Sequence, residues 1–290
     1  MNTIKVVLDT NVFTQEYFRL IDSSRIRELC KRKRILLIYG HVFLEETLRA
    51  YGNAQKRHVL INQWLPFIAD TAVNFCNDFD EIFHEELVQG RGSSTRVFMS
   101  ANKSEALARK LRNIPTDGSW NAWEITKLER ESENIKRLAQ REVSKSIRNE
   151  IADWRKAINY KPNKHGKIRL TNFLDKEIDN LGRSFIKVII QCKNPIAISC
   201  MWSKNKSSYP YFTNFVINTL YIAYHAMINV NDRIDINAQA DLDLMSHLMN
   251  ANILVSNETG FLRKAFNDLW APRNKVIFTS SEFVDYLKHL

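Results

Sequence analysis

The stretch IKVVLD, residues Ile4–Asp9, is a short run of apolar and β-branched residues that ends in an aspartate. A continuous apolar run of this length is typical of a strand that is buried on both faces of a parallel sheet. The run ILLIY, residues Ile35–Tyr39, has the same character and is closed by Gly40. Apolar residues recur at helical spacing over Gln15–Lys31 and over about Val42–Leu65, so we predict a helix for each range. Strands and helices that alternate in this way predict a parallel sheet of the α/β class.

The same alternation returns in the last third of the chain. The predicted elements are, in chain order, helices over Phe212–Met227 and Asp241–Met249, a strand over Asn252–Ser256, a helix over Phe261–Leu269 and a strand over Lys275–Thr279. Ser281 is expected to cap a final helix that has Glu282 and Asp285 in its first turns. We therefore expect the two ends of the chain to form one doubly wound sheet.

Strand-like runs are scarce in the middle of the chain. Apolar residues at spacings of three, four and seven predict a long helix over Trp123–Asn159, and Asn159–Leu170 predicts a basic turn. We expect residues 1–70 and 205–290 to form one discontinuous α/β domain, and residues 71–204 to form a basic, mainly helical insertion.

The positive charge of the chain is concentrated in this insertion. The chain has 290 residues, with 42 Lys and Arg against 32 Asp and Glu, and a net charge of +10. The range Ala101–Leu170 holds 17 of these basic residues and 9 of the acidic ones, which leaves it a net charge of +8. A basic block attracts the phosphates of nucleic acids, although a long solvated helix carries Lys and Arg as well.

The four cysteines lie far apart and form no C-x-x-C motif: Cys30, Cys76, Cys192 and Cys200. This spacing argues against a disulfide scaffold or a structural zinc site. The opening MNTIKVVLDTNVF has one Lys and an apolar run interrupted by Asp9, unlike a signal peptide. The apolar stretch Phe215–Ile228 is shorter than the ~20 residues that a membrane span needs. We expect a cytoplasmic protein that does not enter a membrane.

Acidic residues lie close to the carboxyl ends of the predicted strands, where parallel sheets bind their ligands. Asp9 ends the first strand, Glu46 lies one turn into the helix after the second, and Glu258 follows the strand Asn252–Ser256 by two residues. Asp241 opens the helix before that strand, and Asp243 is two residues further on. We expect these carboxylates to converge on one site.

Converging carboxylates repel one another unless a divalent cation neutralises them. Oxygen ligands without Cys or His suit Mg²⁺ or Mn²⁺ rather than zinc. Such an ion polarises a phosphoryl oxygen and activates water. An acidic metal site beside a basic surface therefore predicts the cleavage of a nucleic acid.

Each acid also has a plainer interpretation. Asp9 could be a turn former, and Glu45 and Glu46 could lie on the solvent face of a helix. Asp241 and Glu258 could each occupy a first helical turn and complement the helix dipole. What favours a site is the placement that these acids share. The one histidine on the helix of Asp241 is His247, and we interpret it as a packing or surface residue rather than a ligand.

Three stretches together resemble the motif blocks of PIN-domain nucleases: VVLDTNVF (Val6–Phe13), VFLEETLR (Val42–Arg49) and DLDLMSHLMNANILVSNETGF (Asp241–Phe261). The resemblance implies a PIN-like α/β/α sandwich with a parallel central sheet, here carrying a large helical insertion. It covers roughly residues 1–65 and 210–290 and says nothing of the insertion.

In the first block the resemblance implies that Asp9 is a catalytic metal ligand. Thr10 and Asn11 would then orient Asp9 or the attacking water through hydrogen bonds. The acid of the second block falls on Glu46, and Glu45 is the alternative assignment.

In the third block the resemblance assigns a third acid to Asp241, with Asp243 as an additional or alternative ligand. The fourth acid falls on Glu258, which follows the pair Ser256 and Asn257. The family usually has Asp at this place, so the longer Glu is a departure from its pattern.

We therefore predict a Mg²⁺- or Mn²⁺-dependent endonuclease that acts on RNA and leaves a 5′-phosphate and a 3′-hydroxyl. Single-stranded DNA stays open as a substrate, because this chemistry needs no 2′-hydroxyl. The resemblance also suggests a toxin or defence effector that pairs with a regulatory protein or antitoxin, and a homo-oligomer stays open as well. The alternative is a non-catalytic PIN-like module for nucleic-acid binding or protein assembly.

Overall fold

The computed structural model describes residues 3–113, 146, 149–151, 153, 156–157, 169–188, 190, 192–229 and 238–290. It divides into two compact units. The first unit consists of Met1–Phe79, Arg96–Ile125 and Asp243–Leu290. The second consists of Asp80–Thr95 and Thr126–Leu242.

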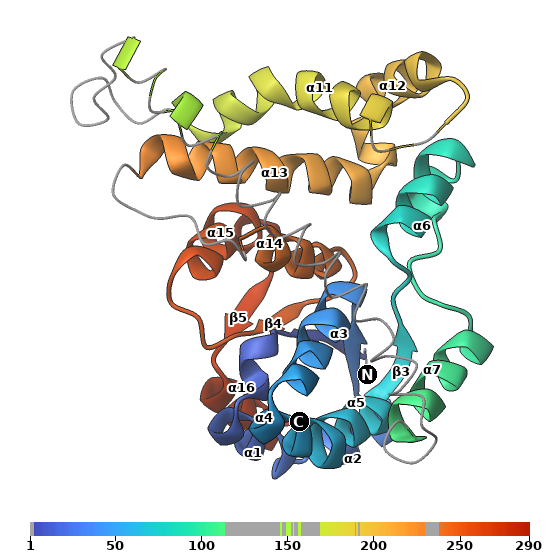
Figure 1. Cartoon of the computed structure of the whole chain (residues 1–290), viewed down its shortest axis with the longest axis vertical. Helices are drawn as coiled ribbons and strands as arrows, with labels where there is room; N and C mark the ends of the chain where they lie inside the picture. The colour runs from blue at the N-terminus through green and yellow to red at the C-terminus, as the bar shows by residue number, and fades with distance from the viewer. Residues whose placement is uncertain are drawn as a thin grey trace. The chain divides into compact units, whose positions relative to one another are not determined.

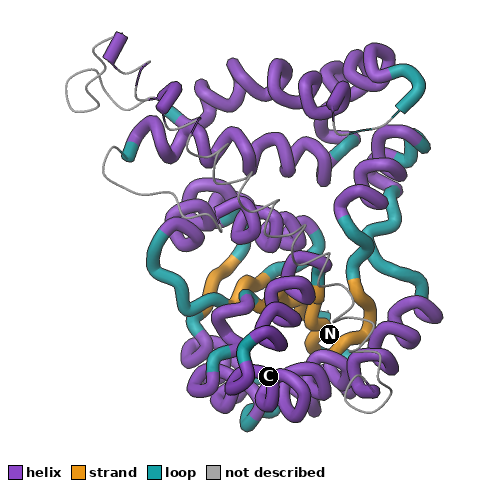
Figure 2. Tube along the Cα trace, viewed as in Figure 1, coloured by secondary structure: helices purple, strands orange, loops and turns teal. Residues whose placement is uncertain are grey.

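A five-stranded sheet forms the centre of the first unit, and all its strand pairs are parallel (Figures 1 and 2). Its strands are β1 (Ile4–Leu8), β2 (Ile35–Tyr39), β3 (Ala72–Phe75), β4 (Ile253–Val255) and β5 (Val276–Phe278). They follow the order β3-β2-β1-β4-β5, so the direction of strand addition reverses at β1. Ligands of open parallel sheets bind at such a reversal. The predicted parallel α/β sheet is confirmed.

The register of the central strands brings two distant turns together. Val6 of β1 lies beside Leu37 of β2 on one side and beside Ile253 of β4 on the other. One residue beyond β1, the amide of Asp9 donates to the carbonyl of Val255 over 2.9 Å. Asp9 therefore lies at the carboxyl edge of the sheet, next to the turn that follows β4.

Helices flank this sheet on both sides, and Figure 1 shows α15 and α16 on opposite sides of β4 and β5. The helices of the first unit are α1 (Gln15–Asp22), α2 (Ile26–Lys31), α3 (His41–Leu48), α4 (Ala54–Val59), α5 (Leu65–Thr71), α7 (Ala101–Asn113), α15 (Phe261–Leu269) and α16 (Ser280–Lys288). Helix α14 (Ala238–Ser246) contributes residues to both units. The bounds predicted for Phe261–Leu269 are confirmed.

The two long helices predicted in the first 65 residues are wrong as continuous helices, because side chains end them early. The hydroxyl of Ser24 donates to the carbonyl of Ile21 and accepts the amide of Ile26, which separates α1 from α2. The side chain of Asn53 accepts the amides of Gln55 and Lys56 and so starts α4. Such side-chain bonds compete with a continuing helix.

The N-cap of the last helix lies two residues before the predicted one. The N-cap is Thr279 rather than Ser281, because the hydroxyl of Thr279 accepts the amide of Glu282 over 3.3 Å. The carboxylate of Glu282 in turn accepts the amide of Thr279 over 2.7 Å. The two bonds form a capping box.

In its described part the second unit is helical. It contains α11 (Leu170–Val188), α12 (Pro195–Lys204), α13 (Pro210–Ile228) and the π-helical turn His84–Val88, and α6 (Phe79–Phe83) leads into it. Aromatic contacts join α11 to α13, with ring centroids 5.2 Å apart for Phe185 and Phe215. Trp202 of α12 packs directly on Gly182 of α11, where a Cβ would collide with its ring.

The division into units differs from the predicted boundaries at residues 70 and 205. Residues Ala72–Phe75, predicted to belong to the insertion, form β3 because they pair with β2. Helix α13 belongs to the second unit, because its aromatic residues pack on α11. Most of the predicted helix Trp123–Asn159, and the basic turn after it, lies outside the described residues.

Within the described ranges, no helix has both the length and the hydropathy needed to cross a bilayer.

Candidate functional site

The centre of the candidate site is Asp9, whose side chain is 4% exposed. Its Oδ2 accepts 2.6 Å hydrogen bonds from Nδ2 of Asn11 and from the hydroxyl of Ser256. Its Oδ1 accepts weaker bonds of 3.4 Å from Thr10 and from the amide of Asn11. Burial raises the pKa of Asp9 above its ordinary value, while these hydrogen bonds act in the opposite direction. Among the residues that the structure describes, no cation forms an ion pair with Asp9.

A single hydroxyl links Asp9 to a second carboxylate. The hydroxyl of Thr10 lies 3.0 Å from Oε2 of Glu46 and 3.4 Å from Oδ1 of Asp9. Glu46 is half-buried in the middle of α3, the helix that follows β2. The acids of the first and second motif blocks therefore lie next to the same hydroxyl, as predicted from their places in the sequence.

The turns after β1 and β4 are tied together by polar side chains. Asn11 donates to the hydroxyl of Ser256 and accepts the amide of Asn257, each over 3.1 Å. The hydroxyl of Ser256 also accepts the amide of Glu258 over 3.1 Å. Asn257 is anchored in turn by two bonds to Ser280, at the start of α16. This network fixes the orientation of Asp9 from both sides.

Ser256 has a larger role than the sequence suggested. In the sequence Ser256 is one half of the Ser-Asn pair that precedes Glu258. In the structure its hydroxyl donates directly to Asp9. The signal for this role is a Ser-Asn pair directly after a buried strand. It lies at the edge of the sheet where another strand is followed by Asp-Thr-Asn.

The remaining predicted acids are Glu258, in the turn after β4, and two residues of α14. Glu258 is half-buried, and its Oε1 would lie 3.5 Å from a Cβ placed on Gly260, just before α15 begins. Asp241 and Asp243 are half-buried on α14, with Asp241 in the second unit and Asp243 in the first. That these three acids bind a metal stays a prediction.

The donors present fit a magnesium or manganese ion held by two carboxylates. Taking only the described residues, no three His, Cys, Asp or Glu side chains form a group able to hold a metal ion. Mg²⁺, however, usually keeps several waters and takes one or two protein carboxylates together with substrate phosphate oxygens. Asp9 is a buried carboxylate that pairs with no cation of the described part of the chain, and Glu46 lies beside it across the Thr10 hydroxyl. These two acids meet that requirement.

Glu46 and Thr10 line a cleft of about 400 Å³. The other residues that line it are Asn11, Phe13, Thr14, Thr47, Arg49, Ala50, Asn53, Lys56 and Trp64. Two cations, Arg49 and Lys56, thus share the cleft with an acid that belongs to the candidate site. Neither cation was predicted from the sequence, because the place of Lys56 depends on the start of α4 at Asn53.

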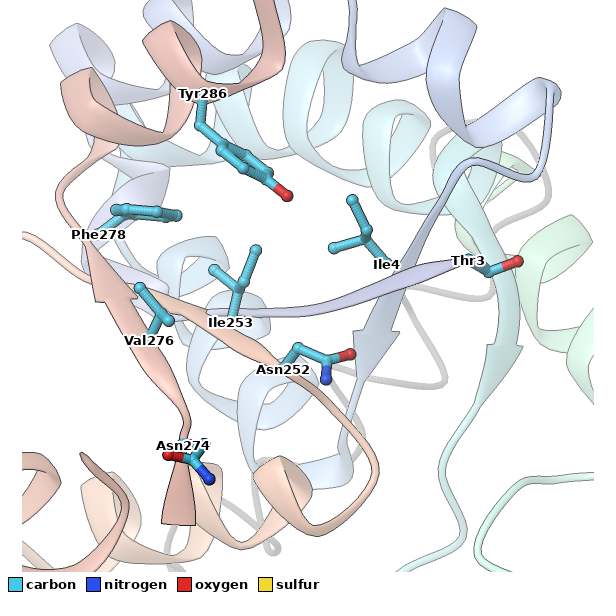
Figure 3. A pocket seen from close by; sticks show the side chains of 8 residues that line it. All are labelled: Thr3, Ile4, Asn252, Ile253, Asn274, Val276, Phe278 and Tyr286. Carbon is cyan, nitrogen blue, oxygen red and sulfur yellow. The ribbon is translucent and has the colours of Figure 1, made fainter. Parts of the chain in front are cut away.

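A second cavity, of about 310 Å³, offers different chemistry (Figure 3). Its wall is formed mainly by the apolar side chains of Ile4, Ile253, Val276 and Phe278, and Tyr286 reaches over them from α16. Its polar lining residues are Thr3, Asn252 and Asn274. Its lining contains no carboxylate, imidazole or amine, and the phenol of Tyr286 is its one titratable group.

His247 is a packing residue, as its place in the sequence suggested. It is 1% exposed and stacks on Phe79 with ring centroids 5.3 Å apart. Burial lowers the pKa of His247 to about 4, so the ring is neutral at physiological pH. Its imidazole lies against Gly40, where any Cβ would collide with it. The glycine that closes β2 is therefore required by this contact.

The site is thus assembled from the turns after β1 and β4 and from the helix after β2. These elements meet where the order of a parallel sheet reverses, the usual place for a ligand site in such folds. The chain was compared with models of protein families, with curated proteins and with solved structures, and none of them matches it.

Proposed function

We propose that this protein is a metal-dependent endonuclease with a PIN-like fold that cleaves RNA. The observation that carries the proposal is the meeting of Asp9 and Glu46 at the hydroxyl of Thr10. The two acids come from separate motif blocks and reach the carboxyl edge of a five-stranded parallel sheet.

Asp9 and Glu46 are the residues that would hold Mg²⁺ or Mn²⁺, with Asp243, Glu258 and Asp241 as candidates for further ligands. When bound, such an ion supplies polarisation of a phosphoryl oxygen and a lower pKa for a coordinated water. The hydrolysis would leave a 5′-phosphate and a 3′-hydroxyl.

The other polar residues hold the acids in place. Asn11 and Ser256 donate to Oδ2 of Asp9 and so favour its carboxylate form. Thr10 donates to Glu46 and holds it beside Asp9. Because burial raises the pKa of Asp9, protons and metal ions compete for this carboxylate. We therefore expect cleavage to fall as the pH is lowered.

The net charge of +10 supports a polyanionic substrate. Cations are also present in the cleft, where Arg49 and Lys56 lie in the lining with Glu46. RNA is the proposed substrate, and single-stranded DNA of the same sequence is the comparison that measures the preference for ribose.

The decisive experiment is the substitution Asp9→Asn, assayed on an end-labelled single-stranded RNA in Mn²⁺. The amide keeps the shape of the side chain but weakens metal binding, so cleavage should be lost while RNA binding and the circular-dichroism spectrum persist. The matched control is Asp285→Asn, which removes an exposed partner of Lys288 on α16 and should cleave normally. Full cleavage by Asp9→Asn would refute the proposal.

A non-catalytic nucleic-acid-binding or assembly module is the second candidate. It is favoured by the small number of acids that meet, since no group of three ligands is formed within the described part of the chain. Calorimetric titration with Mn²⁺ separates the two functions. An enzyme shows saturable binding that Asp9→Asn and Glu46→Gln each weaken, whereas a scaffold shows no saturable binding.

A further inference from the structure

The cleft beside the candidate site has groups of opposite charge in one lining. Glu46 and Thr10 belong to the acidic site, whereas Arg49 and Lys56 bring positive charge to the same cavity. All of these residues lie in the first unit, and three of them fall within eleven residues of the chain. The cleft, of about 400 Å³, falls in the size range of sites for small ligands or a short piece of a single strand.

Lys56 is one of two exposed cations in the lining of this cleft, the other being Arg49. The side chain of Lys56 is exposed and, within the described ranges, it makes no ion pair. The next residue, Arg57, differs. Its Nε donates to the carbonyl of Tyr51 over 2.9 Å, and its guanidinium lies 4.3 Å from the centroid of the Tyr51 ring. Arg57 is therefore held by the fold, while the ammonium of Lys56 is left to attract an anion.

The wall of the cleft also contains polar atoms that lack partners. The hydroxyl of Thr47 and Nε1 of Trp64 are buried, and neither has a hydrogen-bond partner among the described residues. Buried donors without acceptors are costly and call for an explanation. Both residues contribute to the lining of the cleft, but these two donor atoms are themselves covered by the protein.

These features favour a phosphodiester strand over other anions. Glu46 and Thr10 bring the acidic site into the lining of the cleft, and Lys56 adds to the same lining a cation that attracts a phosphate. A single strand carries phosphates at regular intervals, so one phosphate can lie at the acids while a neighbouring one lies at the lysine.

We propose that Lys56, supported by Arg49 and Asn53, binds the phosphate adjacent to the one that reacts at Asp9 and Glu46. The cleft is then a binding site for two successive phosphates of single-stranded RNA. This inference rests on the proposed nuclease function and adds to it the residue that positions the strand.

Fluorescence anisotropy with a labelled single-stranded RNA tests the proposal, in EDTA so that no cleavage occurs. Lys56→Glu should raise Kd by on the order of tenfold, and the slope of log Kd against log salt should fall by about 0.7. Lys56→Arg should keep the slope. The matched control is Lys103→Glu on the exposed face of α7, which should bind like the wild type.

Equal Kd values for Lys56→Glu and Lys103→Glu would overturn the proposal, provided that thermal unfolding shows both variants folded. A polyglutamate peptide that binds at Lys56 more tightly than RNA of equal charge would overturn it in favour of an acidic protein partner. Binding that depends on Lys56, in a wild-type chain that cleaves nothing in Mn²⁺, would support the phosphate site and overturn the nuclease instead.

Discussion

Among the residues that the structure describes, two carboxylates are buried, one in each unit, and they are held by different kinds of donor. Asp9 is bonded mainly by the side chains of Asn11 and Ser256 at the edge of the sheet. Glu86 is fully buried in the second unit, where it accepts the backbone amides of Tyr211 and Phe212 over 3.0 and 2.7 Å. Burial raises the pKa of both acids, and that of Glu86 reaches about 7.

The comparison separates an acid of the candidate site from an acid that serves the fold. Glu86 caps the first turn of α13, whose amides would otherwise lack acceptors, and its surroundings are aromatic, with Phe83 against Phe212. Asp9 instead has a second carboxylate nearby and lies next to a cleft. A raised pKa alone does not tell the two roles apart, whereas the identity of the donors does.

The largest expected difference is in cleavage. Asp9→Asn should lower the rate by at least about a hundredfold, because loss of a direct metal ligand exceeds the effect of losing its outer partners. Glu86→Gln should leave the rate within about twofold, since its contacts are confined to the second unit. Single-turnover cleavage of labelled RNA measures both. A comparable loss in the two variants would end the distinction between them.

For the free energy of unfolding we expect the larger effect from substitution of Glu86 and the smaller one from substitution of Asp9. Glu86→Ala leaves two buried amides of α13 without an acceptor and should reduce the free energy of unfolding by about 2 to 4 kcal/mol. Urea titration followed by tryptophan fluorescence measures the change. Glu105→Ala, an exposed substitution on α7, is the control and should stay within about 0.5 kcal/mol of the wild type. A loss as small as that of the control would mean that Glu86 is not the cap of α13.

The stability of the second unit should depend on pH in a defined direction. The folded pKa of Glu86 is about 7, above its ordinary value of 4.5, so the folded state binds the proton more tightly than the unfolded state. Its contribution is therefore fully present below pH 4.5 and is lost as the pH rises through 7, by up to about 3 kcal/mol.

Thermal unfolding of the wild type and of Glu86→Gln between pH 5 and pH 8 tests this dependence. The amide does not titrate, so the variant should lose most of the pH dependence in that window. The pKa of Asp9 is also raised, and the variant Asp9→Asn measures how much of the pH dependence comes from this residue. A wild type that becomes more stable as the pH rises from 5 to 8 would contradict the assignment.

The smallest expected effect concerns the donors of Asp9. Ser256→Ala removes a 2.6 Å bond to Asp9 and the acceptor of the Glu258 amide, so we expect a loss of about 1 kcal/mol in stability. The cleavage rate should fall by about tenfold. In a plot of rate against pH, the fall on the acid side should move to higher pH, because Asp9 loses a hydrogen bond that favours its ionised form. Ser23→Ala, at an exposed hydroxyl on the C-cap of α1, is the control. An unchanged pH profile would argue against a positioning role for Ser256.

The sequence predicted the strands well, because fully buried strands need continuous apolar runs. It also predicted the position of Asp9, since a parallel sheet places its strand ends together. The short strand β3 escaped notice because AVNF is a short run that contains a polar residue, and only its pairing with β2 defines it. The unit to which α13 belongs was predicted wrongly for a similar reason, because only its packing against α11 shows that it lies in the second unit.

The long-range polar contacts could not be predicted from local sequence. Glu86 meets α13 across 125 residues of chain, and nothing near either segment in the sequence announces the other. The cations of the cleft were missed because Lys56 gains its meaning only from the bend that Asn53 introduces before α4. Local patterns predict elements, whereas the way in which elements meet decides which polar groups share a cavity.

The bond between Asn11 and Ser256 spans 245 residues of chain. At a synthesis rate of about 5 to 20 residues per second, roughly 12 to 50 s pass between the translation of the first partner and that of the second. During that time the nascent chain carries its first aspartate without the turn that orients it. Any nascent chain that stops short of Ser256 therefore lacks the hydroxyl that donates to Oδ2 of Asp9.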